Sequence, residues 1–157
     1  MTKRWGTFLG VAALAGVIAA GGLAAEAGHL PGTKKHKIVY HFNGSDDGNH
    51  VKKATVVLGN IQNHVNGVGG WKNVEDVVLV THGEGIVPFI EKNMDPELRK
   101  RFDILTVSGM QLGVCGNTLK AKKLTIEEFR DGSVRLDQGG VTALMEYQEK
   151  GYSYIRP

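Results

Sequence analysis

The chain has 157 residues, of which 41% are hydrophobic and 22% charged, the composition of one ordinary globular domain. The formal net charge is only +3, and the lysines are scattered without interleaved aromatic residues. Because nucleic-acid binding needs a concentrated basic face, no nucleic-acid partner is expected. The weak positive charge is more simply a solubility feature.

The N-terminal segment predicts export. Met1–Arg4 is short and basic, Phe8–Leu23 is almost wholly apolar, and Ala25-Glu26-Ala27 offers small residues at both positions that a signal peptidase inspects. This pattern predicts a secretory signal peptide over residues 1–27 and a periplasmic protein with no membrane contact after cleavage. The alternative is an uncleaved membrane anchor, because the apolar run is nearly long enough to span a bilayer. Its many Gly and Ala residues and the cleavage site favour removal.

Residues 28–35 contain Pro31-Gly32 and are predicted to be a linker, which leaves residues 36–157 as the folded domain. The apolar and aromatic run His36–Phe42 predicts the first strand. Turn formers and capping residues follow it, and Asn49 or Asp47 is expected to cap a helix over about 50–65. That helix carries one apolar stripe at three- and four-residue steps.

The second predicted strand, over 74–80, is an unbroken and mostly β-branched run, which is typical of parallel strands buried on both faces. It stops in Thr81-His82-Gly83-Glu84-Gly85. Pro96 then suits the first turn of a helix capped by Asp95. Leu98, Phe102, Leu105 and Met110 are expected on the buried side of that helix.

The rest of the chain continues the alternation. The sequence predicts a strand ending at Cys115, short helices over 118–124 and 125–130, a weak strand over 133–136, a helix over 141–150 and a last strand over 152–155. A capping-box spacing marks the start of the second short helix, at Thr125 and Glu128. Together these elements predict a three-layer α/β fold, with a mostly parallel sheet covered on both faces by helices.

Cys115 is the only cysteine of the chain and lies where a predicted strand meets a predicted helix. The N-terminal end of a helix favours the thiolate over the thiol, and only the thiolate is a nucleophile. Exported proteins usually carry cysteines in pairs as disulfides, whereas this one cannot bridge within its own chain. We therefore expect a working thiol. The alternative is a buried, inert cysteine that acts as a small hydrophobe.

Loops that leave the carboxyl ends of parallel strands share one edge of the sheet, where ligands bind. This rule brings His82, Glu84, Asn43 and Asn117 toward Cys115. His82 is expected to take the thiol proton or stabilise the thiolate, although a histidine in such a loop often only stabilises the loop. Glu84 would raise the thiol pKa unless it orients His82. Asn43, Glu84 and Asn117 are the predicted binding residues.

The sequence contains no motif for nucleotide binding, metal binding, dithiol redox chemistry or serine hydrolysis. The loop over 43–48 matches neither a P-loop nor a dinucleotide-binding fingerprint, and helix capping explains its carboxylates better than a cation does. The histidines show no convincing metal spacing, and the chain has no Cys-x-x-Cys or Gly-x-Ser-x-Gly. No metal ion or cofactor is expected.

Three segments resemble the DsrE/DsrF-like family of sulfur-relay proteins: Lys37–Phe42, Val77–Ile86 and Leu112–Leu119. The closing Gly140–Ile155 is also similar, so the resemblance covers 35–157. It implies a compact α/β fold with a five-stranded, mainly parallel sheet and a homo-oligomer, a trimer or hexamer. It also implies that Cys115 accepts sulfane sulfur as a persulfide and passes it to thiol- or persulfide-bearing partner proteins or small sulfur compounds, which agrees with thiolate chemistry.

The predicted export signal departs from the family pattern, because the well-known relay members of the family work in the cytosol. Three functions therefore stand side by side. The first is a periplasmic sulfur carrier that uses Cys115, and the second is a non-catalytic, oligomeric small-ligand-binding or assembly module with a structural cysteine. The third is a thiol redox sensor that forms an intermolecular disulfide or a sulfenic acid.

Overall fold

The computed structural model describes residues 34–157. The signal peptide predicted over 1–27 and the linker predicted over 28–35, except Lys34 and Lys35, lie outside the described residues. Within 34–157, no helix has both the length and the hydropathy needed to cross a membrane.

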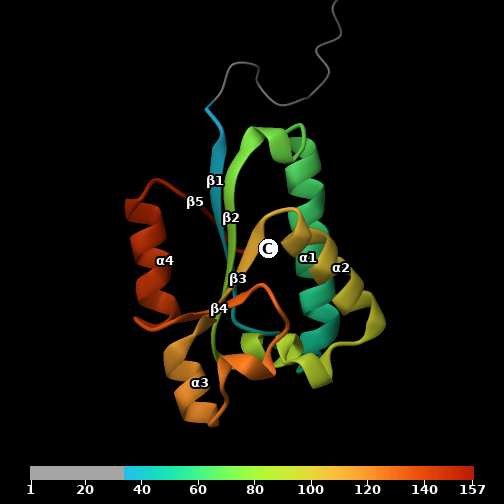
Figure 1. The fold of residues 1–157 in the computed structure, drawn as a ribbon, viewed down its shortest axis with the longest axis vertical. Coiled ribbons are helices and arrows are strands. Elements are labelled where there is room, and N and C mark those ends of the chain that lie inside the picture. Colours follow the sequence, from blue (N-terminus) through green and yellow to red (C-terminus); the bar gives the residue numbers. More distant parts are fainter. Residues whose placement is uncertain (1–33) are drawn as a thin grey trace, which may run out of the picture.

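The centre of the fold is one five-stranded sheet in the order β4-β3-β2-β1-β5 (Figure 1). Its strands are β1 His36–Phe42, β2 Val74–Thr81, β3 Met110–Cys115, β4 Ser133–Leu136 and β5 Ser153–Ile155. Every neighbouring pair runs parallel, so the sheet is wholly parallel where a mostly parallel one was predicted. The carboxyl ends of all five strands consequently face the same way, as the predicted site requires.

Helices cover both faces of the sheet, which confirms the predicted layers. Helices α1 His50–Gly67 and α2 Pro96–Val107 pack on one face, and α4 Gly140–Glu149 packs on the other (Figure 1). The short α3 Gly116–Lys122 lies beyond the carboxyl end of β3. The two faces therefore differ in how much cover they have.

Alternation along the strands decides what each face buries. On the α1/α2 face, buried side chains of the strands join those of both helices in one large cluster, which includes Tyr40, Leu79, Leu58, Phe102 and Leu105. On the α4 face, the cluster is small and consists of Val39, Val78, Val80, Leu136, Ala143 and Leu144. Most of the apolar core thus lies on the α1/α2 face.

Local signals explain most element ends. Asn49 caps α1 by accepting a hydrogen bond from the Lys52 N–H at 3.3 Å, and Asp95 caps α2 through the Leu98 N–H at 2.7 Å. The helix predicted over 125–130 is only a 3-10 turn, Ile126–Glu128, although its capping box is present. Met110, expected on α2, instead begins β3, because Gly109 at φ 115° ends the helical stretch before it.

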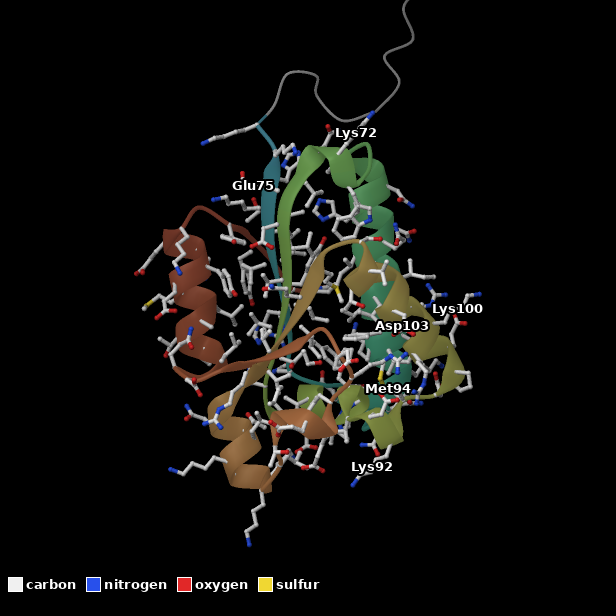
Figure 2. All side chains as sticks on the ribbon, in the orientation of Figure 1. Lys72, Glu75, Lys92, Met94, Lys100 and Asp103 are labelled. Atoms are coloured by element: carbon white, nitrogen blue, oxygen red, sulfur yellow. The ribbon has the colours of Figure 1, made fainter. Side chains whose placement is uncertain are left out.

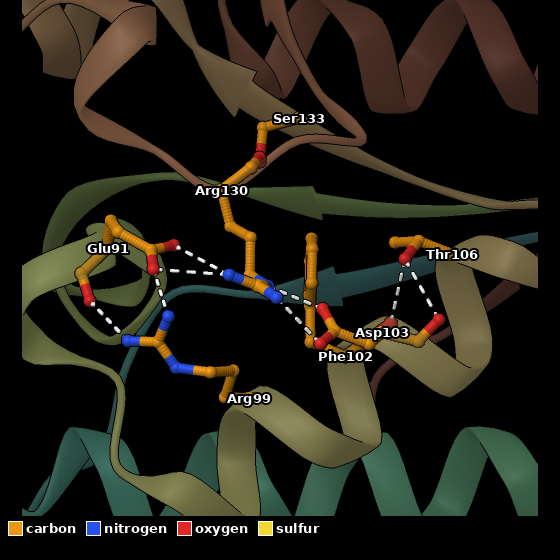
Figure 3. A network of polar contacts seen from close by, with 7 residues as sticks. All are labelled: Glu91, Arg99, Phe102, Asp103, Thr106, Arg130 and Ser133. Atoms are coloured by element: carbon orange, nitrogen blue, oxygen red, sulfur yellow. Dashed lines mark hydrogen bonds and ion pairs between the residues drawn. The ribbon is translucent and has the colours of Figure 1, made fainter.

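A network of charged side chains ties α2 to the turn before β4 (Figure 3). Arg130 donates to Asp103 Oδ2 at 2.7 Å and to Glu91 Oε1 at 3.1 Å, and Arg99 also pairs with Glu91. The hydrogen bond from Arg130 holds the pKa of Asp103 below its ordinary value.

Lysines that are scattered in the sequence also lie apart in space, with Lys72 and Lys92 at opposite ends of the molecule (Figure 2).

Candidate functional site

Cys115 is the last residue of β3 and the N-cap of α3, and its side chain is buried, with 5% exposed. Burial raises the pKa of its thiol. Hydrogen bonds from the Thr118 hydroxyl and from the backbone N–H groups of Gly140, Thr118 and Asn117 outweigh that effect and lower the pKa below its ordinary value. The sulfur therefore lies in a cradle of donors from α3 and from the start of α4, which favours the thiolate.

The hydroxyl of Thr118 has a fixed direction. Its Oγ1 accepts a hydrogen bond from the Gly83 N–H at 3.1 Å. Since a backbone N–H can only donate, the hydroxyl keeps its own proton for Cys115. The loop after β2 thus orients a donor on α3 toward a sulfur at the end of β3.

Gly140 lies between Cys115 and His82. A Cβ atom built on Gly140 would be 3.3 Å from Cys115 Cβ and 3.2 Å from His82 Cβ. Both contacts are closer than ordinary van der Waals packing, so a residue with a side chain would crowd the site. The glycine therefore lets α4 approach the sheet edge closely enough to place its N–H on the sulfur. It also shows that His82 and Cys115 are neighbours, as predicted.

His82 is oriented by His41, a residue of β1. The two Nε2 atoms are 2.7 Å apart, and the rings are stacked with centroids at 4.8 Å. His41 Nδ1 in turn lies 2.7 Å from the hydroxyl oxygen of Tyr154. Burial lowers the pKa of His41 to about 4, with further contributions from His82 and Arg156. Burial, followed by Arg156, also lowers the pKa of His82, so both rings are neutral at neutral pH.

The predicted binding residues take different places. Asn117 contributes its backbone N–H to the Cys115 sulfur, and its side chain lies against Gly139. Glu84 forms an ion pair with Lys122 of α3 at 2.6 Å, and this hydrogen bond lowers the Glu84 pKa. The group that orients His82 is therefore His41, in the role that the sequence offered to Glu84.

Asn43 belongs to a separate hollow of about 460 Å³ at the end of β1. Its Oδ1 accepts a hydrogen bond from Arg156 at 3.2 Å. His41, Lys53 and Arg156 also line this hollow, together with Asp46 and Asp47. His41 is the residue that joins the hollow to the pair of imidazoles.

The sequence did not single out four contributors: His41, Tyr154, Thr118 and Gly140. For His41 a signal existed, because it follows Val39 by two positions and therefore shares its face of the sheet. Tyr154 needed the pairing of β5 with β1, which only the structure supplies. Among residues 34–157, no group of three His, Cys, Asp or Glu side chains is placed to hold a metal ion.

Comparisons with known proteins agree with this fold. The model of the DsrE/DsrF-like family matches residues 36–157. The solved structure of MTH1491, a protein of unknown function from Methanobacterium thermoautotrophicum, is similar with a TM-score of 0.62 and 22% identity, over 78% of this chain and 100% of that one. The YchN protein from E. coli is similar with a TM-score of 0.51 and 15% identity, over 78% and 99%. The search of curated proteins gave no match. The chain belongs to the DsrE/DsrF-like family.

Proposed function

We propose that this protein is a periplasmic sulfur carrier that accepts sulfane sulfur as a persulfide on Cys115 and passes it to a partner thiol. The observation that carries the proposal is the cradle of hydrogen-bond donors around the Cys115 sulfur, which lowers the thiol pKa despite burial. Membership of a family associated with sulfur relay supports it.

Sulfur transfer needs only the Cys115 thiolate, a sulfur donor, a partner thiol and a group that exchanges protons. The Cys115 thiolate attacks the outer sulfur of a donor, the old S–S bond breaks, and the donor leaves as a thiolate. A partner thiolate later attacks the outer sulfur of the Cys115 persulfide, and the leaving Cys115 thiolate returns to its donors. Neutral His82, beside the cysteine, exchanges protons with the reacting groups. The scheme uses no metal or organic cofactor.

Export and assembly form part of the same proposal. The basic start, apolar stretch and Ala25-Glu26-Ala27 within residues 1–27 support a signal peptide, cleavage after Ala27 and a periplasmic location. Cell fractionation followed by mass spectrometry tests the cleavage and the location. We expect the cleaved protein in the periplasmic extract, and an uncleaved chain in the membrane fraction would contradict both proposals. We also propose a homo-oligomer, a trimer or hexamer, which light scattering of the purified protein tests.

A second function is favoured by a specific observation. Cys115 is only 5% exposed, and a hollow of about 460 Å³ lies at Asn43 and Arg156. A non-catalytic module of this fold would bind a small ligand in that hollow and use Cys115 only for packing. Such a module would behave identically with serine at position 115.

Intact-mass spectrometry after incubation with polysulfide separates the two functions. We expect the wild-type protein to gain sulfur in steps of one atom, to lose it with a reductant, and Cys115→Ser to gain none. The serine variant is a matched control because it changes one buried atom and keeps the hydrogen-bonding character of the site. A wild-type thiol that stays unmodified, and that reacts with an alkylating agent only after unfolding, would overturn the carrier and leave the binding module.

A further inference from the structure

Four side chains form a row across the carboxyl edge of the sheet, on the α4 face. Thr81, the last residue of β2, pairs with Val114, so His82, which continues the chain in an extended conformation after β2, follows level with Cys115, the last residue of β3. His41 pairs with Val80, and Tyr154 pairs with Val39. Because both valines belong to the α4 cluster, the alternation of a strand puts His41 and His82 on that face as well.

The row runs from the interior to the surface. Cys115 is 5% exposed, whereas Tyr154 at the other end is 41% exposed. Between them, the Tyr154 hydroxyl and His41 Nδ1 are 2.7 Å apart, and His41 Nε2 and His82 Nε2 are also 2.7 Å apart. His41 and Tyr154 line a second hollow, of about 490 Å³, and His41 lines the first hollow as well. Solvent therefore reaches the outer end of the row.

The contact between the two imidazoles couples their tautomers. Two nitrogens at 2.7 Å share a single proton, since two N–H groups would repel each other and two lone pairs would form no hydrogen bond. If the proton is on His41 Nε2, neutral His82 carries its own on Nδ1. If the proton is on His82 Nε2, neutral His41 carries its own on Nδ1 and donates to the Tyr154 oxygen. The two neutral rings thus always have opposite tautomers.

We propose that His41 is a positioning residue for His82, and that Tyr154, His41 and His82 form a relay that carries a proton between solvent and the sulfur chemistry at Cys115. This inference rests on the proposed function. His41 lies in contact with His82 rather than with the reacting sulfur, so its effect passes through the tautomer of His82.

The proton balance of sulfur acceptance defines what the relay does. The Cys115 thiolate attacks the outer sulfur of a donor persulfide, R–S–SH, the donor S–S bond breaks, and R–S⁻ leaves. His82 gives its Nδ1 proton to R–S⁻, and takes one at Nε2 from His41. His41 takes one at Nδ1 from Tyr154, which is reprotonated by water. The products are the Cys115 persulfide and R–SH, with one proton taken from solvent and no net oxidation or reduction.

The opposite face of the sheet provides a matched control. Tyr40 and His64 also form a tyrosine–histidine hydrogen bond, at 2.5 Å, but in the cluster of the α1/α2 face. His64→Gln and Tyr40→Phe therefore remove the same kinds of contact on the face that does not carry Cys115. Any general effect of losing such a pair appears in these controls.

The test measures the rate of persulfide formation on wild type, His41→Gln, Tyr154→Phe and the two control variants. Glutamine keeps a polar side chain but cannot pass a proton on. We expect His41→Gln to load sulfur at least about 10-fold more slowly, within the range of acid–base catalysis. Tyr154→Phe should fall between it and wild type, and the controls should match wild type. Added imidazole, which delivers protons directly, should restore the rate of His41→Gln.

Wild-type rates for both His41→Gln and Tyr154→Phe, or a slow His41→Gln that imidazole leaves unchanged, would overturn the relay. If His41→Gln fails to fold, the exposed Tyr154→Phe decides alone. Nitrogen-15 spectra of the histidine rings give a readout independent of sulfur, with opposite tautomers expected for His41 and His82. Equal tautomers would overturn the coupling. A wild-type protein that takes up no sulfur would instead overturn the proposed function and leave the coupling to be judged by these spectra.

Discussion

Each face of the sheet carries a histidine–tyrosine pair, but the two pairs have different surroundings. The α1/α2 face buries a large apolar cluster, and its histidine–tyrosine pair, His64 and Tyr40, ends in that cluster. The α4 face buries a small cluster, and its pair, His41 and Tyr154, continues to a second imidazole beside a thiol. The comparison teaches that stability is concentrated on the thickly covered face, while the thinly covered face has room for chemistry.

Core truncations on the two faces give the largest expected effects. Phe102→Ala should lower the free energy of unfolding by about 3–5 kcal/mol, and Leu144→Ala by about 2–3 kcal/mol, because Leu144 belongs to the smaller cluster. Thiol reactivity should show the reverse order. Leu144 anchors α4, whose Gly140 N–H donates to Cys115, whereas Phe102 lies on the other face.

Urea unfolding gives the free energies, and the pH dependence of Cys115 alkylation gives the thiol pKa. We expect the pKa to rise in Leu144→Ala and to stay at the wild-type value in Phe102→Ala. An unchanged thiol pKa in Leu144→Ala would break the link between α4 packing and the site.

A substitution at Thr118 tests the thiol site on the α4 face directly, without truncating a core residue on either face. Thr118→Val keeps the shape of the side chain but removes the hydroxyl that donates to the sulfur. The thiol pKa should rise, and alkylation at neutral pH should slow by about tenfold or more, since a hydrogen bond to a charged group contributes about 1.5–3 kcal/mol. Thr118→Ser retains the hydroxyl and serves as the control. A valine variant with wild-type alkylation rates would show that the backbone donors alone set the thiol pKa.

The smallest expected effect concerns the ion-pair network on the α2 side (Figure 3). Arg130 lowers the pKa of Asp103, so the pair stabilises the fold fully above the unfolded pKa of an aspartate, about 3.9. That contribution is lost as the pH falls through the lower, folded pKa. Asp103 is 41% exposed, so solvent screening limits the effect to about 1 kcal/mol.

Urea midpoints of wild type and Arg130→Gln at pH 7 and pH 3 measure the contribution of the Arg130–Asp103 pair to stability. The two proteins should differ at pH 7, and the difference should be smaller at pH 3, while Cys115 reactivity stays the same in both. A difference that is equal at the two pH values would assign the effect to packing by the arginine side chain instead.

Much of the fold could be predicted because its strands are short, apolar and clearly bounded. The run over 74–80 indicated a strand buried on both faces, and β2 is such a strand. Met110 was placed wrongly on α2, since a methionine at a helical step after Leu105 fits either element until Gly109 separates them. The turn over 126–128 was predicted too long, because a capping box marks where a helix begins and not how far it continues.

The candidate site was predictable only to the level of a sheet edge. The rule for parallel strands correctly put His82 beside Cys115. It did not give the partners of His82, because these depend on the register between β2, β1 and β5 and on which face each side chain takes. Nor did the sequence show that the loop after β2 orients Thr118, a contact between residues 35 positions apart.

The lengths of the outermost strands have a further consequence. The sheet ends in β4 and β5, with only 4 and 3 residues, while the longer strands lie between them. A short border offers few unpaired backbone groups to a strand from another molecule. The short outer strands therefore limit pairing of this sheet with other molecules, and a substitution that lengthened β5 is expected to make that edge more prone to aggregation.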